Sequence, residues 1–180
     1  MGPRGRLGRF RKLAALALAA YPITPARLVP LGHMENTTYR VDTPNGERYV
    51  LRIERTTGSP MHPPRRAEEV RSELTWVTAV RRETGLAVPE PVAAADGSPL
   101  TVVEMEGVPE PRVCVLFRWQ PGRFLDSGLT PSHLERVGRF TARLHVHAAG
   151  FVPPEGFSRW APPAITLLTL STRWMSTAER

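Results

Sequence analysis

The sequence of 180 residues contains one lysine, one cysteine and no long apolar run. A single cysteine, Cys114, excludes a disulfide scaffold and a cysteine-rich zinc site. A membrane-spanning helix needs about 20 consecutive apolar residues, and no segment approaches that length. Of the 24 basic side chains only Lys12 is lysine. The composition therefore disfavours enzymes that bind phosphate through a buried lysine, unless arginine takes its place.

Other features of the composition point to a globular protein. Apolar residues make up 41% of the chain, too many for a disordered one, and the length suffices for a domain with its own core. The net charge of +7 raises the question of nucleic acid. The arginines between residues 65 and 82 scatter around a helix axis, and no basic–aromatic stripe occurs. We therefore expect a cytoplasmic protein with neither a nucleic-acid nor a membrane partner.

The N-terminal segment, residues 1–26, combines several arginines with a short Leu/Ala-rich run, residues 13–20. This pattern fits a signal peptide, or a helix that packs its leucines on the domain. The apolar run is short for a signal peptide, and Leu13, Leu16 and Ala20 recur at helical spacing. We favour the packed helix.

Most of the chain up to residue 119 has strand-like patterning. Turn signals occur at residues 44–46 and at Asp96-Gly97. Between residues 48 and 53 polar and apolar residues alternate, so Arg48, Val50 and Arg52 share one face of a strand. The expected strands are residues 28–31, 37–41, 48–53, 92–95, 100–104 and 112–119.

Helical periodicity indicates two further helices, at residues 65–83 and 131–149. The apolar stripe of the first is Val70, Leu74, Val77 and Val80, and that of the second is Leu134, Val137, Thr141, Leu144 and Ala148. Strands and helices do not alternate, which disfavours a doubly wound sheet. The order predicts an α+β fold, an antiparallel sheet of about five strands with a helix between the third and the fourth.

Several segments in this order resemble one enzyme family. They are residues 30–41, 47–53, 72–76, 88–92, 115–122 and 138–147, the last with a Leu144-His145 pair. Together they resemble the phosphotransferase enzyme family, which includes aminoglycoside phosphotransferases, choline kinases and homoserine kinases and has a protein-kinase-like fold. The resemblance covers roughly residues 8–160.

The resemblance implies a division of the chain. Residues 27–119 would form a kinase-like small lobe, and residues 120–160 the hinge linker and the first helix of a large lobe. Residues 161–180 do not resemble the family, which favours a frameshift or a premature stop. The family's reaction transfers the γ-phosphate of ATP to a hydroxyl of a small molecule.

The same resemblance assigns roles to residues near the phosphates. The loop from Gly32 to Asn36 would cover the nucleotide phosphates with backbone N–H groups, although an ordinary hairpin turn has the same sequence. Arg52 occupies the position of the phosphate-binding lysine of kinases, and Glu73 would be its ion-pair partner. Glu73 lies within about 40° of the apolar stripe of its helix, where a carboxylate needs a cation. The alternatives are a solvent-facing arginine and a glutamate that reaches water.

The adenine site would lie where the last strand enters the hinge. Backbone groups of Phe117 to Trp119 would meet the edge of the base, and Val50 would cover one of its faces. A core strand with two aromatic residues fits the same sequence.

The catalytic and metal-binding loops of the family have no counterpart in the sequence. Kinase-like enzymes need an aspartate that orients the attacking hydroxyl, and an Asn and a second Asp that hold magnesium. Here Asp126 is the last aspartate, and no H-x-D-x-x-x-x-N motif occurs. We expect ATP as the cofactor, no magnesium ligands in this chain and no catalysis by it. The alternative is a non-catalytic kinase-like module that binds a nucleotide or a partner.

Overall fold

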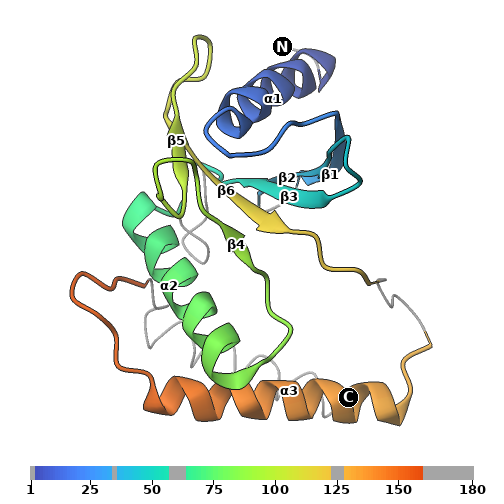
Figure 1. Cartoon of the computed structure of the whole chain (residues 1–180), viewed down its shortest axis with the longest axis vertical. Helices are drawn as coiled ribbons and strands as arrows, with labels where there is room; N and C mark the ends of the chain where they lie inside the picture. Colours follow the sequence, from blue (N-terminus) through green and yellow to red (C-terminus); the bar gives the residue numbers. More distant parts are fainter. Residues whose placement is uncertain (1–2, 34–35, 57–63, 123–127, 160–180) are drawn as a thin grey trace, which may run out of the picture.

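The computed structural model describes residues 3–33, 36–56, 64–122 and 128–159 (Figure 1). In chain order the elements are α1 (Pro3–Leu18), β1 (Arg27–His33), β2 (Thr37–Asp42), β3 (Arg48–Ile53), α2 (Ala67–Thr84), β4 (Pro91–Val92), β5 (Thr101–Val103), β6 (Arg112–Arg118) and α3 (Pro131–Gly150). In these ranges, no helix has the length and apolar character needed to cross a membrane.

The strands form one antiparallel sheet, as the sequence predicts. Its order is β1-β2-β3-β6-β4, and β5 also pairs with β6. The described residues contain six strands, which correspond to the six expected segments and exceed the expected sheet of about five strands by one; β4 is only two residues long. The predicted hairpin at residues 44–46 joins β2 to β3, and Gly46 has a positive φ of 84° there. The expected α+β class is confirmed.

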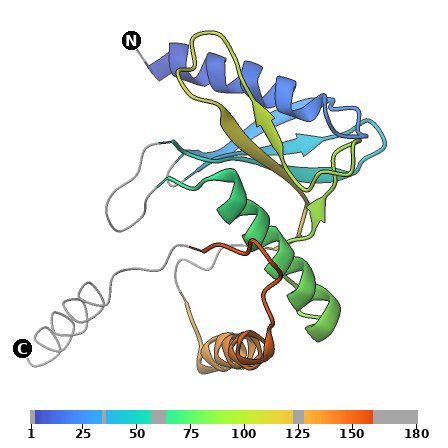
Figure 2. The ribbon, with the colours of Figure 1, turned by 90° about the vertical axis from the view of Figure 1, so that its left-hand side faces the viewer.

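The two faces of the sheet are covered by different helices. Figure 2 shows α1 on one side of the sheet and α2 on the other. Along β3, Tyr49, Leu51 and Ile53 are buried in the same core as α1. Val50 and Arg52 alternate with them and therefore lie on the α2 face. The predicted assignment of β3 residues to two faces is confirmed.

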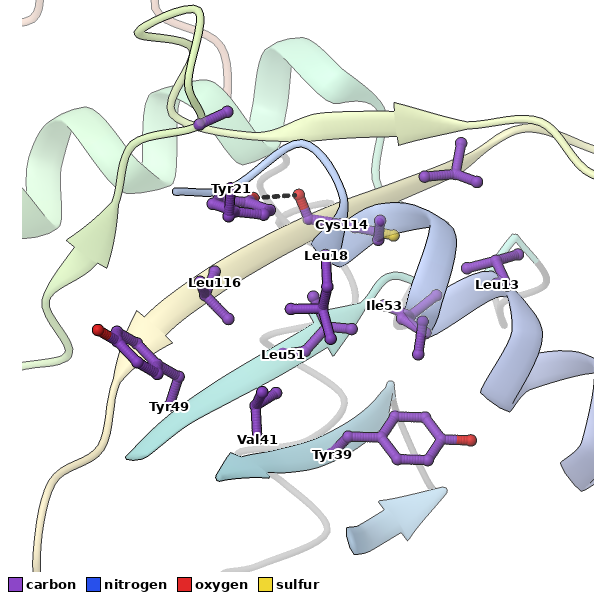
Figure 3. Packing of buried hydrophobic residues seen from close by; sticks show 14 residues of the cluster. Leu13, Leu18, Tyr21, Tyr39, Val41, Tyr49, Leu51, Ile53, Cys114 and Leu116 are labelled. Atoms are coloured by element: carbon purple, nitrogen blue, oxygen red, sulfur yellow. Dashed lines mark hydrogen bonds between the residues drawn. The ribbon is translucent and has the colours of Figure 1, made fainter. Parts of the chain in front are cut away.

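Helix α1 packs on the sheet, as the favoured interpretation of the N-terminal segment predicts. The expected stripe is confirmed for Leu13, which is buried, and Ala20 is partly buried, but Leu16 is 51% exposed. Leu18 (Figure 3), Ala14 and Ala17 complete the buried face. The correction has a simple cause. Residues 13, 14, 17 and 18 recur at helical spacing and form one face, and Leu16 lies away from that face. Leu13, Ala14, Ala17, Leu18 and Tyr21 thus belong to the core of the sheet.

Cys114 lies in this core and should be chemically inert. Its side chain is fully buried, and burial, together with the charge of Glu54, raises the pKa of the thiol to about 12. Because the thiolate is the reactive species, the folded protein should not react with Ellman's reagent near pH 8. The denatured chain should react fully, which makes thiol labelling an assay for unfolding. Rapid reaction of the folded protein would contradict the packing of this core.

Helix α2 begins and ends with recognisable caps. Glu69 accepts a hydrogen bond from the backbone N–H of Arg66 at 2.9 Å. At the other end Gly85 adopts a left-handed conformation with φ 65° and closes the last turn. Val70, Leu74 and Val80 of the predicted stripe are buried, and Val77 is partly buried. This helix places Glu73 beside the sheet.

Helix α3 packs mainly against the C-terminal half of α2, where Phe140 and Leu144 are partly buried. Thr130 caps it and Pro131 is its first residue. The predicted inner stripe is wrong apart from Leu144, since Leu134 is 60% exposed and Val137 is 62% exposed. The periodicity correctly predicts the helix. Several of the helix's apolar residues, however, have no packing partner in the described part of the chain.

Candidate functional site

The register of the sheet brings the predicted site residues into two adjacent rows. Gly32 pairs with Thr38, and Thr38 pairs with Arg52. Since neighbouring strands lie about 4.8 Å apart, Gly32 and Arg52 are separated by about 10 Å across the sheet. In the other row Val50 pairs with Phe117, and Phe117 pairs with Pro91. Residues distant in sequence therefore meet around the centre of one sheet face.

Arg52 and Glu73 form the expected ion pair between β3 and α2. The guanidinium of Arg52 donates from Nη1 to Oε1 of Glu73 at 3.0 Å, and from Nη2 to Oε2 at 2.8 Å. The same guanidinium lies 5.1 Å from the centre of the Phe117 ring. Its side chain is only 16% exposed. The solvent-facing alternative for Arg52 is therefore wrong, as is that of a Glu73 that only reaches water.

Two further charged residues join this pair. Glu54 Oε1 lies 2.7 Å from Nε of Arg52, and Arg65 Nη1 lies 2.6 Å from Oε2 of Glu73. The cluster thus alternates cations and carboxylates, with two of each. A planar guanidinium suits this arrangement because it presents donors on two edges.

Burial and pairing act in opposite directions on the pKa values. Burial works to lower the pKa of Arg52, but the hydrogen bonds that it donates to Glu73 and the charges of Glu54 and Glu73 raise it overall. For Glu73, burial works to raise the pKa, but the hydrogen bonds and charges of Arg52 and Arg65 lower it overall. Arg52 and Glu73 are therefore both charged at neutral pH.

The loop between β1 and β2 reaches the end of β3. Oδ1 of Asn36 accepts a hydrogen bond from the backbone N–H of Arg55 at 3.2 Å. A Cβ at Gly32 would meet Thr38 Oγ1 at an ordinary 3.7 Å, so packing does not demand glycine there. The remaining loop residues, 34 and 35, lie outside the described residues. Asn36 thus ties the loop to the strand that carries Arg52.

The hinge end of β6 is held by backbone hydrogen bonds. The N–H of Arg118 donates to the carbonyl of Glu90 at 2.9 Å, and the N–H of Trp119 donates to that of Arg48 at 3.0 Å. Adenine could use these two N–H groups only if the present bonds were exchanged. The side chain of Phe117 is 7% exposed and lies in the core beneath α2.

Helix α3 and the segment after it both contact α2. Arg143 donates to the carbonyl of Thr84 at 2.5 Å, and His147 Nε2 lies 3.0 Å from Glu83 Oε2. The N–H of Ser158 donates to Oγ of Ser72 at 2.9 Å, one residue from Glu73. Figure 1 shows this segment beside α2. These contacts hold the helix that supplies the carboxylate.

The described part of the chain has no cluster of three or more His, Cys, Asp or Glu side chains that could hold a metal ion. No step proposed below passes through a metal ion.

Comparison with a family model gives a match over residues 27–178 to the phosphotransferase enzyme family, abbreviated APH. The chain belongs to this family. The match continues through residues 161–178, which the sequence analysis placed outside the resemblance. It starts at Arg27, so helix α1 lies outside it.

Two solved structures of kinases have a fold similar to that of this chain. A microcompartment-associated aminopropanol kinase is 32% identical, with a TM-score of 0.70, over 84% of this chain and 44% of that chain. An amicoumacin kinase, solved with AMP-PNP, Ca2+ and amicoumacin, is 19% identical with a TM-score of 0.65, over 96% of this chain and 53% of that one. The chain spans about half the length of these structures. No curated protein matched.

Sequence reasoning missed two of the charged residues in the cluster around Arg52 and Glu73. Glu54 could have been found, since strand alternation places it on the face of Arg52. Arg65 gave no signal, because it precedes α2 and only the path of the chain brings it to Glu73.

Proposed function

We propose that this chain is the nucleotide-binding part of an ATP-dependent small-molecule phosphotransferase. The observation that carries the proposal is the two-point pairing of Arg52 with Glu73. In kinases the strand-borne cation contacts the α- and β-phosphates, and the helix glutamate holds it in place. A pair that only stabilised the fold would not need to lie in the row of Gly32.

The phosphates and the base would occupy different parts of the site. Phosphates would lie between Arg52 and the loop from Gly32 to Asn36, which is about 10 Å away across the sheet. The adenine ring would lie against Val50, near the backbone of Phe117 to Trp119. AMP-PNP in the amicoumacin kinase structure supports nucleotide use within this fold.

The phosphate acceptor and the transfer step are expected to need residues that this sequence does not contain. No aspartate follows Asp126, so no carboxylate in a catalytic-loop motif is present to orient a hydroxyl. We expect the chain to bind ATP without transferring phosphate. ATP-dependent phosphorylation of any acceptor, lost on Arg52→Ala, would contradict this.

ATP should raise the melting temperature of the chain. At a ligand concentration of about 100 times Kd, mass action adds about 2.7 kcal/mol of stability. For a domain of this size that corresponds to a shift of roughly 5–10 °C. Differential scanning fluorimetry with ATP measures this shift. The control variant Arg139→Ala should keep the shift, because Arg139 forms an exposed pair with Glu135 away from the proposed site. An unchanged melting temperature at millimolar ATP would overturn the proposal.

A second candidate is a non-catalytic module that binds a partner protein. Exposed apolar side chains on α3, among them Leu134, Val137 and Val146, favour it. A defined partner that co-purifies and is lost on Val137→Asp, in a chain that ATP does not stabilise, would support this candidate over nucleotide binding.

A further inference from the structure

Glu54 carries a buried carboxylate and lies one residue after Ile53, the last residue of β3. Its backbone N–H donates to the carbonyl of Val113 at 2.8 Å, so the pairing of β3 with β6 fixes its position. Strand alternation then places its side chain on the same face as Arg52. Its side chain is only 2% exposed. Burying a carboxylate is costly unless a cation accompanies it, so this position calls for an explanation.

Arg52 is the cation that accompanies Glu54. Oε1 of Glu54 lies 2.7 Å from Nε of Arg52, an ion pair whose angle falls short of an aligned hydrogen bond. Neither carboxylate oxygen has a hydrogen-bond partner within the described ranges. The carboxylate is therefore held by charge, and Arg52 is its counterion.

The two carboxylates contact different edges of one guanidinium. Glu54 lies at Nε, while Glu73 accepts from Nη1 and Nη2. A guanidinium has about five N–H groups. Two of them donate to Glu73 and the one at Nε adjoins Glu54, which leaves about two for a ligand. A lysine ammonium is a single point on a flexible stem and has no second edge for Glu54 to hold.

We propose that Glu54 is a positioning residue that fixes the guanidinium plane of Arg52 from its Nε edge. The N–H groups left over then point in a set direction, toward the phosphates of a bound nucleotide. Glu54 would also explain why this site works with arginine. The inference rests on the proposed function, because the phosphates are the ligand that Arg52 is aligned to receive.

A double-mutant cycle tests this role through the Kd for ATP, measured by isothermal titration calorimetry on the full chain. Glu54→Gln should raise Kd about tenfold when Arg52 is present, a loss of about 1.4 kcal/mol. In the Arg52→Lys background the same substitution should change Kd less than twofold, since lysine has no Nε edge. Glu54→Asp keeps the charge and shortens the reach, and it should also raise Kd.

A purely structural role predicts a different pattern. Glu54→Gln would then lower the melting temperature and leave Kd unchanged, or change Kd equally in both backgrounds; either result overturns the proposal. Val103→Ala is the control for general destabilisation, since it truncates the core on the α1 side and should leave Kd unchanged. Should Glu54→Gln fail to fold, Glu54→Asp alone decides, and an unchanged Kd overturns the proposal.

The same titration distinguishes a failure of the proposed nucleotide binding from a failure of the positioning role of Glu54. Wild-type chain that fails to bind ATP overturns the proposed function, and the positioning role with it. Wild-type chain that binds ATP, with equal affinity in the Glu54 variants, overturns the positioning role alone.

Discussion

Arg52→Ala is expected to destabilise the chain by about 3–5 kcal/mol, the usual cost of removing one partner from a buried ion pair. Glu54 and Glu73 would both remain near each other on the α2 face without the cation between them. Arg65 would still contact Glu73, but nothing described would neutralise Glu54. Urea denaturation followed by circular dichroism measures the loss. Arg139→Ala, which breaks an exposed pair, should cost less than about 1 kcal/mol.

The deficit of Arg52→Ala should shrink as the pH falls. In the wild-type protein the pKa of Glu73 is lowered, so its contribution is complete above the ordinary glutamate pKa of about 4.5 and is lost as pH falls through the lowered value. Without Arg52 the effect of burial weighs more, and the pKa of Glu73 should rise. Protonation then relieves the repulsion in the variant before it weakens the wild type. The unfolding free energies of the wild type and of Arg52→Ala should therefore lie closer together at pH 5 than at pH 7.

A deficit that is equal at both pH values would mean that lost packing against Phe117 causes the effect, and not the unpaired carboxylates. Arg52→Met separates the two contributions, because it keeps most of the side-chain volume and removes the charge. It should be as destabilising as Arg52→Ala at pH 7. Both variants should also lose the thermal stabilisation by ATP.

The site could be predicted where local periodicity alone decides the geometry. Alternation along β3 fixed the face of Arg52, and the helical turn of α2 placed Glu73 beside the apolar stripe. These two inferences are enough to bring the pair together once the helix lies on that face. The register that sets Gly32 in the row of Arg52 has no comparable sequence signal, because it depends on the bulge between Pro30 and Gly32.

Predictions failed where the choice of face depends on the partner. In α3 the apolar residues allow more than one inner face, and only contact with α2 selected Phe140 and Leu144. The α2 contact also recruits His147, which pairs with Glu83 and packs against Phe151. A sequence pattern records that a helix is amphipathic, but the neighbour decides which side is buried.

Leu18→Ala is expected to destabilise the chain by about 2–5 kcal/mol, because it empties a fully buried site between α1 and the sheet. Leu16→Ala is the matched control on the same helix. Leu16 is 51% exposed, so its truncation should cost no more than about 0.5 kcal/mol. Unfolding in urea measures both. The stripe expected from sequence, Leu13, Leu16 and Ala20, predicts the opposite ranking, so equal or reversed effects would contradict the observed packing.

Cys114 adds a local measurement to this comparison. It lies in the same core, and its carbonyl accepts a hydrogen bond from the Tyr21 hydroxyl just after α1 (Figure 3). Opening of α1 away from the sheet should therefore expose the thiol. Leu18→Ala should speed Ellman's labelling under native conditions, whereas Leu16→Ala should not. Helix α1 precedes the family match at Arg27, yet it covers the face of β3 opposite Arg52.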